Sequence, residues 1–201
     1  MAISTEQVES FARNGYVIID NFLNSDEYRN ILDHYFSLLP TNKFQYSKIG
    51  KDSTSQQDRT IRGDKICWLD PHEPTKALHP FFQKLTEIQK ITNENFYLGI
   101  KDFEALFAYY EPGSFYKKHS DQFHHDSSRQ LTYVFYMNDN WQEGDGGELL
   151  VYNLADELVI KVAPTGNRLI LFLPREFPHE VLQCSKERKS IVGWFHNKLL
   201  T

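Results

Sequence analysis

The chain has 201 residues, of which 40% are hydrophobic, a length that suits one domain with its own core, so we expect residues 1–201 to form a single domain. No apolar run is long enough to cross a bilayer, and a formal net charge of −5 without a long Lys/Arg block argues against nucleic acid as the main partner. Cys67 and Cys184 lie far apart and lack a C-x-x-C partner, which indicates reduced thiols in a cytoplasmic protein.

The first part of the chain, about residues 1–95, carries helix signals. Ser4 is a good N-cap with Gln7 three residues later, and apolar residues follow at helical spacing. Pro40 ends a second amphipathic segment that opens with acidic residues. We expect helices over residues 4–13, 25–39 and 78–93, a strand over 16–20, and an exposed loop over 41–60.

The second part, about residues 96–198, consists of short β-branched and aromatic runs closed by turn residues. Such antiparallel strands at regular spacing are typical of two packed sheets. The sequence predicts a mainly β fold with flanking helices (α+β), with a double-stranded β-helix (jelly roll) or barrel core braced by the amino-terminal helices. The strands are expected within residues 103–113, 129–139, 146–153, 167–174 and 189–197.

The stretch YKKHSDQFHHD at 116–126 contains two H-x-D pairs. Residues i and i+2 of a strand project from one face, so such a pair can aim an imidazole and a carboxylate at one metal ion. One pair follows a turn and precedes a predicted strand, whereas the other falls within a loop and is less preorganised. We therefore favour His119 and Asp121 over His124 and Asp126.

A third metal ligand has to come from elsewhere in the chain. His179 follows the predicted strand at 167–174, and a jelly roll could bring it beside the H-x-D pair. Two histidines and one carboxylate form the facial arrangement of non-haem iron sites. The run KERK at 186–189 offers a cation for a small dicarboxylate, with Lys186, Arg188 and Lys189 as alternatives.

Several strings together resemble the iron(II)- and 2-oxoglutarate-dependent prolyl 4-hydroxylase family, specifically its oxygen-sensing branch. They are IRGDKICW at 61–68, YEPGSFYKKHSD at 110–121, TYVFYMNDNW at 132–141, GGELLVY at 146–152 and PHEV at 178–181. The resemblance extends from about residue 61 to 195, and IRGDKI separates this branch from the wider superfamily.

The resemblance implies a role for each matching residue. It implies iron ligation by the H-x-D pair and His179, and binding of the cosubstrate carboxylate by an arginine and a tyrosine. One pocket tyrosine matches Tyr110, but its neighbour Tyr109 is an alternative for the same position. The implied metal ligands are His119, Asp121 and His179, which are catalytic together with Arg188; the implied cosubstrate pocket is Tyr110, Thr132, Tyr136, Arg188 and Trp194; and the implied substrate contacts are Arg62, Asp64, Tyr116 and Arg129.

The implied cofactors are Fe(II), 2-oxoglutarate and O2, with ascorbate in support. The implied reaction is hydroxylation of a prolyl residue in an intracellular protein, with succinate and CO2 as coproducts; translation components are among the expected targets, and a monomer is favoured. A contact from Asp64 to Arg62 or Arg129 is expected to close the preceding loop over a peptide. The alternatives are the same chemistry on a small molecule or another side chain, and an inactive metal-bound binding module.

Overall fold

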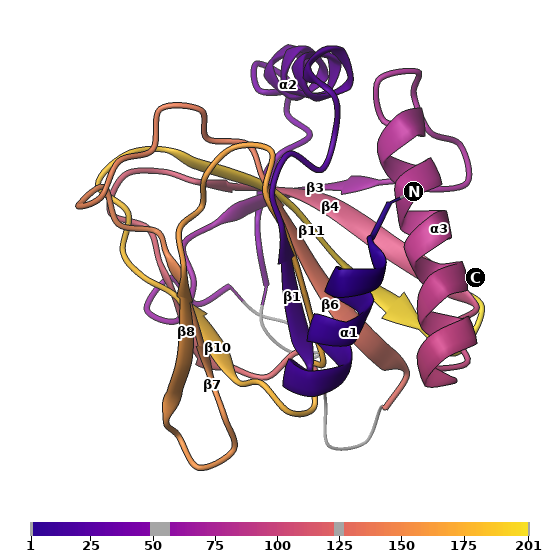
Figure 1. Cartoon of the computed structure of the whole chain (residues 1–201). Coiled ribbons are helices and arrows are strands. Elements are labelled where there is room, and N and C mark those ends of the chain that lie inside the picture. Colours follow the sequence, from indigo (N-terminus) through magenta and orange to yellow (C-terminus); the bar gives the residue numbers. More distant parts are fainter. Residues whose placement is uncertain (1, 49–56, 123–126, 201) are drawn as a thin grey trace.

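The computed structural model describes residues 2–48, 57–122 and 127–200 (Figure 1). His124, Asp126 and the middle of the predicted 41–60 loop lie outside these residues. The described helices are α1 (Thr5–Asn14), α2 (Ser25–Leu38) and α3 (His79–Phe96); the described strands are β1 (Tyr16–Ile19), β2 (Gln45–Tyr46), β3 (Lys65–Leu69), β4 (Asp102–Tyr110), β5 (Tyr116–His119), β6 (Arg129–Tyr136), β7 (Leu149–Tyr152), β8 (Leu158–Val162), β9 (Leu169–Phe172), β10 (His179–Val181) and β11 (Arg188–His196).

The strands form two antiparallel sheets that face each other (Figure 1). In the described part of the chain, the large sheet has the order β1-β9-β6-β11-β4-β3-β2 and the small sheet the order β5-β10-β7-β8. Apolar side chains from the inner faces of both sheets pack together, among them Leu149 and Val151 of the small sheet and Val134 and Phe172 of the large one. This arrangement confirms the double-stranded β-helix predicted from the sequence.

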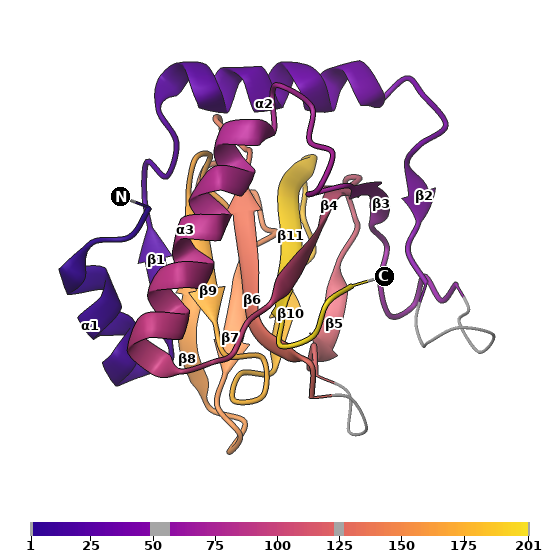
Figure 2. The ribbon, with the colours of Figure 1, turned by 90° about the vertical axis from the view of Figure 1, so that its right-hand side faces the viewer.

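Residue alternation along the strands divides the core into two layers. On β6, Leu131, Tyr133 and Phe135 pack with the helices, whereas Thr132, Val134 and Tyr136 face the small sheet. This is the two-residue period of a strand that is buried on both faces. The helices cover the outer face of the large sheet, as Figure 2 shows. Their buried side chains include Phe11 of α1, Ile31 and Tyr35 of α2, and Phe81, Leu85 and Ile88 of α3.

Local signals account for the helix ends. Ser4 and Gln7 form the expected capping box at the start of α1. At its other end Gly15 has φ 72°, a left-handed conformation that suits glycine, and an added Cβ would lie 2.9 Å from the Phe177 ring. Helix α2 is capped by Asn24, whose side chain accepts from two backbone N–H groups of the first turn.

The first 70 residues contain three strands of the large sheet as well as two of the expected helices. The strand predicted at 16–20 is β1, which pairs with β9. Strand β2 falls within the segment predicted as loop, and β3 carries part of the IRGDKICW string and pairs with β4. Cys67 and Cys184 are both buried free thiols, as expected. Among the described residues, no helix combines the length and apolar character needed to cross a membrane.

Candidate active site

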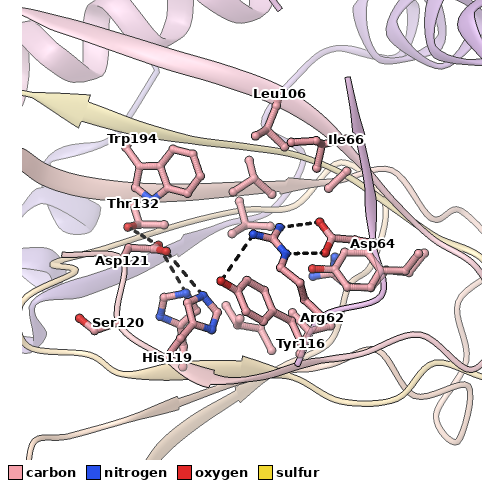
Figure 3. A pocket seen from close by; sticks show the side chains of 18 of the residues that line it. Arg62, Asp64, Ile66, Leu106, Tyr116, His119, Ser120, Asp121, Thr132 and Trp194 are labelled. Atoms are coloured by element: carbon pink, nitrogen blue, oxygen red, sulfur yellow. Dashed lines mark hydrogen bonds and ion pairs between the residues drawn. The ribbon is translucent and has the colours of Figure 1, made fainter. Parts of the chain in front are cut away.

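Strand pairing brings the expected metal ligands together (Figure 3). His119 ends β5 and His179 begins β10, and the antiparallel register sets these two residues directly opposite each other. Asp121 follows β5, with its carboxylate oxygens 3.5 Å from Nε2 of His119 and 3.4 Å from Nε2 of His179. One ligand atom from each residue lies within 4.8 Å of the others, an arrangement that could hold a metal ion.

Neighbouring groups orient each ligand. Nδ1 of His119 lies 2.8 Å from the carbonyl oxygen of Lys117, and Nδ1 of His179 lies 3.1 Å from that of Phe177. Because a carbonyl only accepts, each Nδ1 carries a proton, so Nε2 is the ring nitrogen that faces the site and can bind a metal ion once it has lost its own proton. The buried hydroxyl of Thr132 donates to Oδ2 of Asp121 at 2.9 Å. The ligands are thus preorganised by the backbone and by β6.

The three residues also shift one another's pKa values. Burial raises the pKa of Asp121, but the charge of His179 and hydrogen bonds from both histidines outweigh it and hold this pKa well below its ordinary value. Burial and the charge of His179 lower the pKa of His119. Burial also lowers the pKa of His179, but Asp121 outweighs that effect and raises it. An ionised carboxylate between two imidazoles is the electrostatic environment that a divalent cation requires.

A cavity of about 380 Å³ between the two sheets connects the triad to a buried arginine. Arg188 is only 3% exposed, and its Nε donates to the carbonyl oxygen of Gly147 at 2.8 Å. Nη1 donates to Ser190 at 3.2 Å, and the guanidinium lies 4.9 Å and 5.2 Å from the ring centroids of Tyr110 and Tyr136. The cavity therefore has a metal-ligand end and a cationic end.

A buried hydroxyl without a hydrogen-bond partner in the described part of the chain lies on a residue next to Arg188. The Tyr136 hydroxyl is buried and makes no hydrogen bond with any described residue. Burial raises the pKa of Tyr136 to about 12, against the lowering effect of Arg188, so the hydroxyl keeps its proton. A buried hydroxyl donor beside a guanidinium suits a carboxylate, and the two residues fit the distal carboxylate of 2-oxoglutarate.

The structure shows which of the adjacent residues Tyr109 and Tyr110 lines the cavity. Tyr110 is buried and lines the cavity. Tyr109 points to the opposite face of the sheet, where its hydroxyl donates to Glu187 at 2.8 Å. Trp194 lines the cavity near Asp121, and its buried Nε1 has no hydrogen-bond partner among the described residues (Figure 3).

The expected substrate contacts all line the cavity and form two separate groups. Arg62 forms a two-point ion pair with Asp64, at 2.8 Å and 2.6 Å, and its guanidinium lies over the Tyr116 ring at 4.2 Å. Tyr116 in turn stacks on His119, with ring centroids 3.6 Å apart. Of the two partners considered for Asp64, the structure has Arg62. The other partner, Arg129, is held by Glu104 at 3.0 Å instead.

Ten of the residues that line the cavity were not among the predicted site residues. Because strand residues two apart share a face, Tyr110 implies Leu106 and Ala108, and Thr132 implies Val134. Trp68, 57% exposed, extends the wall outward on β3. Alternation was therefore the signal that could have found these positions. The additional lining residues are Lys48, Ile66, Trp68, Leu106, Ala108, Ser120, Val134, Leu149, Val181 and Val192.

A double-stranded β-helix with two histidines and one carboxylate at one end of its cavity defines the class of non-haem iron oxygenases. The family model "2OG-Fe(II) oxygenase superfamily" matches residues 105–196. Members of this superfamily use Fe(II), 2-oxoglutarate and O2, which agrees with the donor set and with the Arg188–Tyr136 pair.

Solved structures narrow the class. A Pseudomonas putida prolyl-4-hydroxylase is 31% identical, with a TM-score of 0.84 and coverage of 96% of this chain and 98% of that one. A Trichoplax adhaerens prolyl hydroxylase, solved with a hypoxia inducible factor oxygen degradation domain peptide, is 29% identical, with a TM-score of 0.84 and coverage of 95% and 87%. The chain belongs to the prolyl 4-hydroxylase family of 2-oxoglutarate oxygenases.

A curated relative from Caenorhabditis elegans, named hypoxia-inducible factor prolyl hydroxylase, is 26% identical over 206 residues. The match covers 98% of this chain but only 28% of that protein, so the chain spans less than a third of the relative's length.

Proposed function

We propose that this protein hydroxylates a prolyl residue of another protein in a reaction that depends on iron(II) and 2-oxoglutarate. The observation that carries the proposal is the cavity with the His119–Asp121–His179 triad at one end and Arg188, which lies beside the Tyr136 ring, at the other. The similarity to prolyl hydroxylases over nearly the whole chain supports a prolyl substrate over a small molecule.

Each cavity residue has a part in this proposal. His119, Asp121 and His179 hold the iron, with Thr132 orienting the carboxylate. Arg188 and Tyr136 bind the distal carboxylate of 2-oxoglutarate through charge-assisted hydrogen bonds, and this binding sets the direction in which the cosubstrate lies. Tyr110, Thr132 and Trp194 form the walls of the cosubstrate pocket and exclude water from it. When bound, iron(II), 2-oxoglutarate and dioxygen supply the oxidising chemistry that converts C–H to C–OH, with succinate and CO2 as coproducts.

The prolyl substrate enters at the side where Trp68 is exposed. Arg62, Asp64, Tyr116 and Arg129 line the same cavity as Trp68, and the Arg62–Asp64 pair lies against the Tyr116 ring. The exposed indole of Trp68 offers an apolar surface to a peptide. We propose that the substrate is an intracellular protein, with translation components as candidates, and that the enzyme works in the cytoplasm as a monomer.

The proposal is tested with purified protein, iron(II), 2-oxoglutarate and ascorbate. The first probe is a hypoxia inducible factor oxygen degradation domain peptide, and the second is a lysate of the source organism. A mass increase of one oxygen on proline, absent without 2-oxoglutarate and absent in His179→Ala, is the expected result. Succinate release without any protein product would indicate a small-molecule substrate, and neither signal would indicate a binding module.

A further inference from the structure

Charged and polar side chains gather at the open end of the large sheet, beside the metal ligands. We call Glu104, Ser128, Arg129 and His196 the Glu104 cluster. Glu104 lies on β4, Arg129 begins β6 and His196 ends β11, and the register sets His196 opposite Arg129. Trp194, on the same strand as His196, lies opposite Glu104. The cluster therefore joins three adjacent strands at the rim of the cavity.

Glu104 is the shared acceptor of the cluster. Its Oε1 accepts from Nη2 of Arg129 and from Nε2 of His196, both at 3.0 Å. Nδ1 of His196 lies 3.3 Å from the hydroxyl of Ser128, so both ring nitrogens of this buried histidine have partners. Because a carboxylate only accepts, His196 presents an Nε2–H to Glu104. His196 thus fixes the carboxylate, and the carboxylate fixes the arginine.

Arg129 is held on three sides. Besides its bond to Glu104, Nη1 donates to the backbone carbonyl of Asp121 at 3.2 Å. Its guanidinium lies 3.7 Å from the centroid of the Trp194 ring, which lines the cavity near Asp121 (Figure 3). The arginine therefore connects the cluster to the segment that carries a metal ligand and to the cavity wall.

We infer that Glu104, oriented by His196, is a positioning residue that holds Arg129 over the Trp194 ring and so shapes the rim on which the substrate rests. The inference rests on the proposed function. A free arginine side chain carries about 2 kcal/mol of rotamer entropy, which a substrate would have to remove on binding. The ion pair to Glu104 removes that entropy before the substrate arrives, which is preorganisation.

The kinetic test compares Glu104→Gln, Arg129→Gln and the double variant with the wild-type enzyme, using the hypoxia inducible factor peptide as substrate. Removing the charge-assisted bond is expected to raise the peptide KM about tenfold. The KM for 2-oxoglutarate should rise much less than the peptide KM, because Arg188 and Tyr136, which bind its carboxylate, lie outside the cluster and only Trp194 is shared with the cosubstrate pocket. In the Arg129→Gln background, Glu104→Gln should have no further effect, since Glu104 acts through Arg129.

A second test needs no turnover. In a Trp68→Phe/Trp141→Phe background, Trp194 is the single tryptophan. Glu104→Gln should uncover its ring and raise the iodide quenching constant toward the value of the Arg129→Gln variant. His196→Leu should do the same, whereas His196→Gln, which keeps an N–H donor, should retain protection. Asp20→Asn, which breaks the ion pair with Arg168 at the remote β1–β9 edge, is the matched control and should leave the constant unchanged.

The outcomes separate this inference from the proposed function. A wild-type enzyme that leaves the peptide unmodified counts against the proposed function, while the quenching series still decides the role of Glu104. A quenching constant that Glu104→Gln leaves at the wild-type value overturns the inference. A rise in the 2-oxoglutarate KM as large as that in the peptide KM also overturns it, because it would show a general loss of structure.

Discussion

The Thr132–Asp121 hydrogen bond gives a direct test of how the iron site is built. Thr132 is 1% and Asp121 8% exposed, and the hydroxyl donates to Oδ2 at 2.9 Å. Thr132→Val keeps the shape of the side chain and removes this donor. A hydrogen bond to a buried charged group contributes about 1.5–3 kcal/mol, so the affinity for iron(II) should fall about 10–100-fold.

The assay is anaerobic calorimetric titration with iron(II), which measures metal binding without turnover. Thr132→Ser keeps the hydroxyl and should bind iron within about twofold of the wild type, because the donor is retained. Thr92→Val is a second control, since Thr92 is equally buried on α3 and donates only to backbone carbonyls. It should lower thermal stability and leave iron affinity unchanged. Wild-type iron affinity in Thr132→Val would refute the reasoning.

Three further predictions follow from the cationic end of the cavity and from the rim. Tyr136→Phe removes a hydroxyl that has no partner in the described protein, so the thermal midpoint of the variant should not fall. The Kd of the variant for 2-oxoglutarate should rise at least about tenfold, and a Kd equal to that of the wild type would contradict this. Gly147 has φ 75°, and a Cβ added there would lie 3.0 Å from Cδ of Arg188. Gly147→Ala should therefore weaken 2-oxoglutarate binding and leave iron affinity unchanged, which parallel titrations with each ligand would measure. Burial raises the pKa of Glu104, but the hydrogen bond from His196 and the charge of Arg129 outweigh it and lower the pKa below its ordinary 4.5. The resulting stabilisation is present above pH 4.5 and lost as pH falls through the lower folded pKa, so urea midpoints should fall more steeply below pH 4.5 in the wild type than in Glu104→Gln.

The sequence predicted the three residues whose ligand atoms the structure brings together for a metal ion. His119 and Asp121 are two residues apart in a local segment, and their spacing alone indicated a shared face. Alternation along the strand at 129–136 likewise separates Thr132 and Tyr136 from Tyr133, and these residues do lie on opposite faces of the large sheet. Such features depend on neighbours within a few residues, which the sequence shows directly.

Strand pairing decided what local spacing left open. Local spacing could not decide between Tyr109 and Tyr110, because their roles depend on which face of β4 meets the small sheet. Local spacing also left two partners open for Asp64, and in the structure Asp64 pairs with Arg62 while Arg129 pairs with Glu104.

The amino-acid sequence by itself determined the type of fold, the capped helix at 4–13 and the donor atoms for a metal. Only the tertiary structure decided that His119 faces His179 across a strand pair, and that Glu104 bonds to His196, 92 residues further along the chain. The physical reason is that side-chain direction follows from a strand's local period, whereas the register between distant strands depends on packing of the whole core.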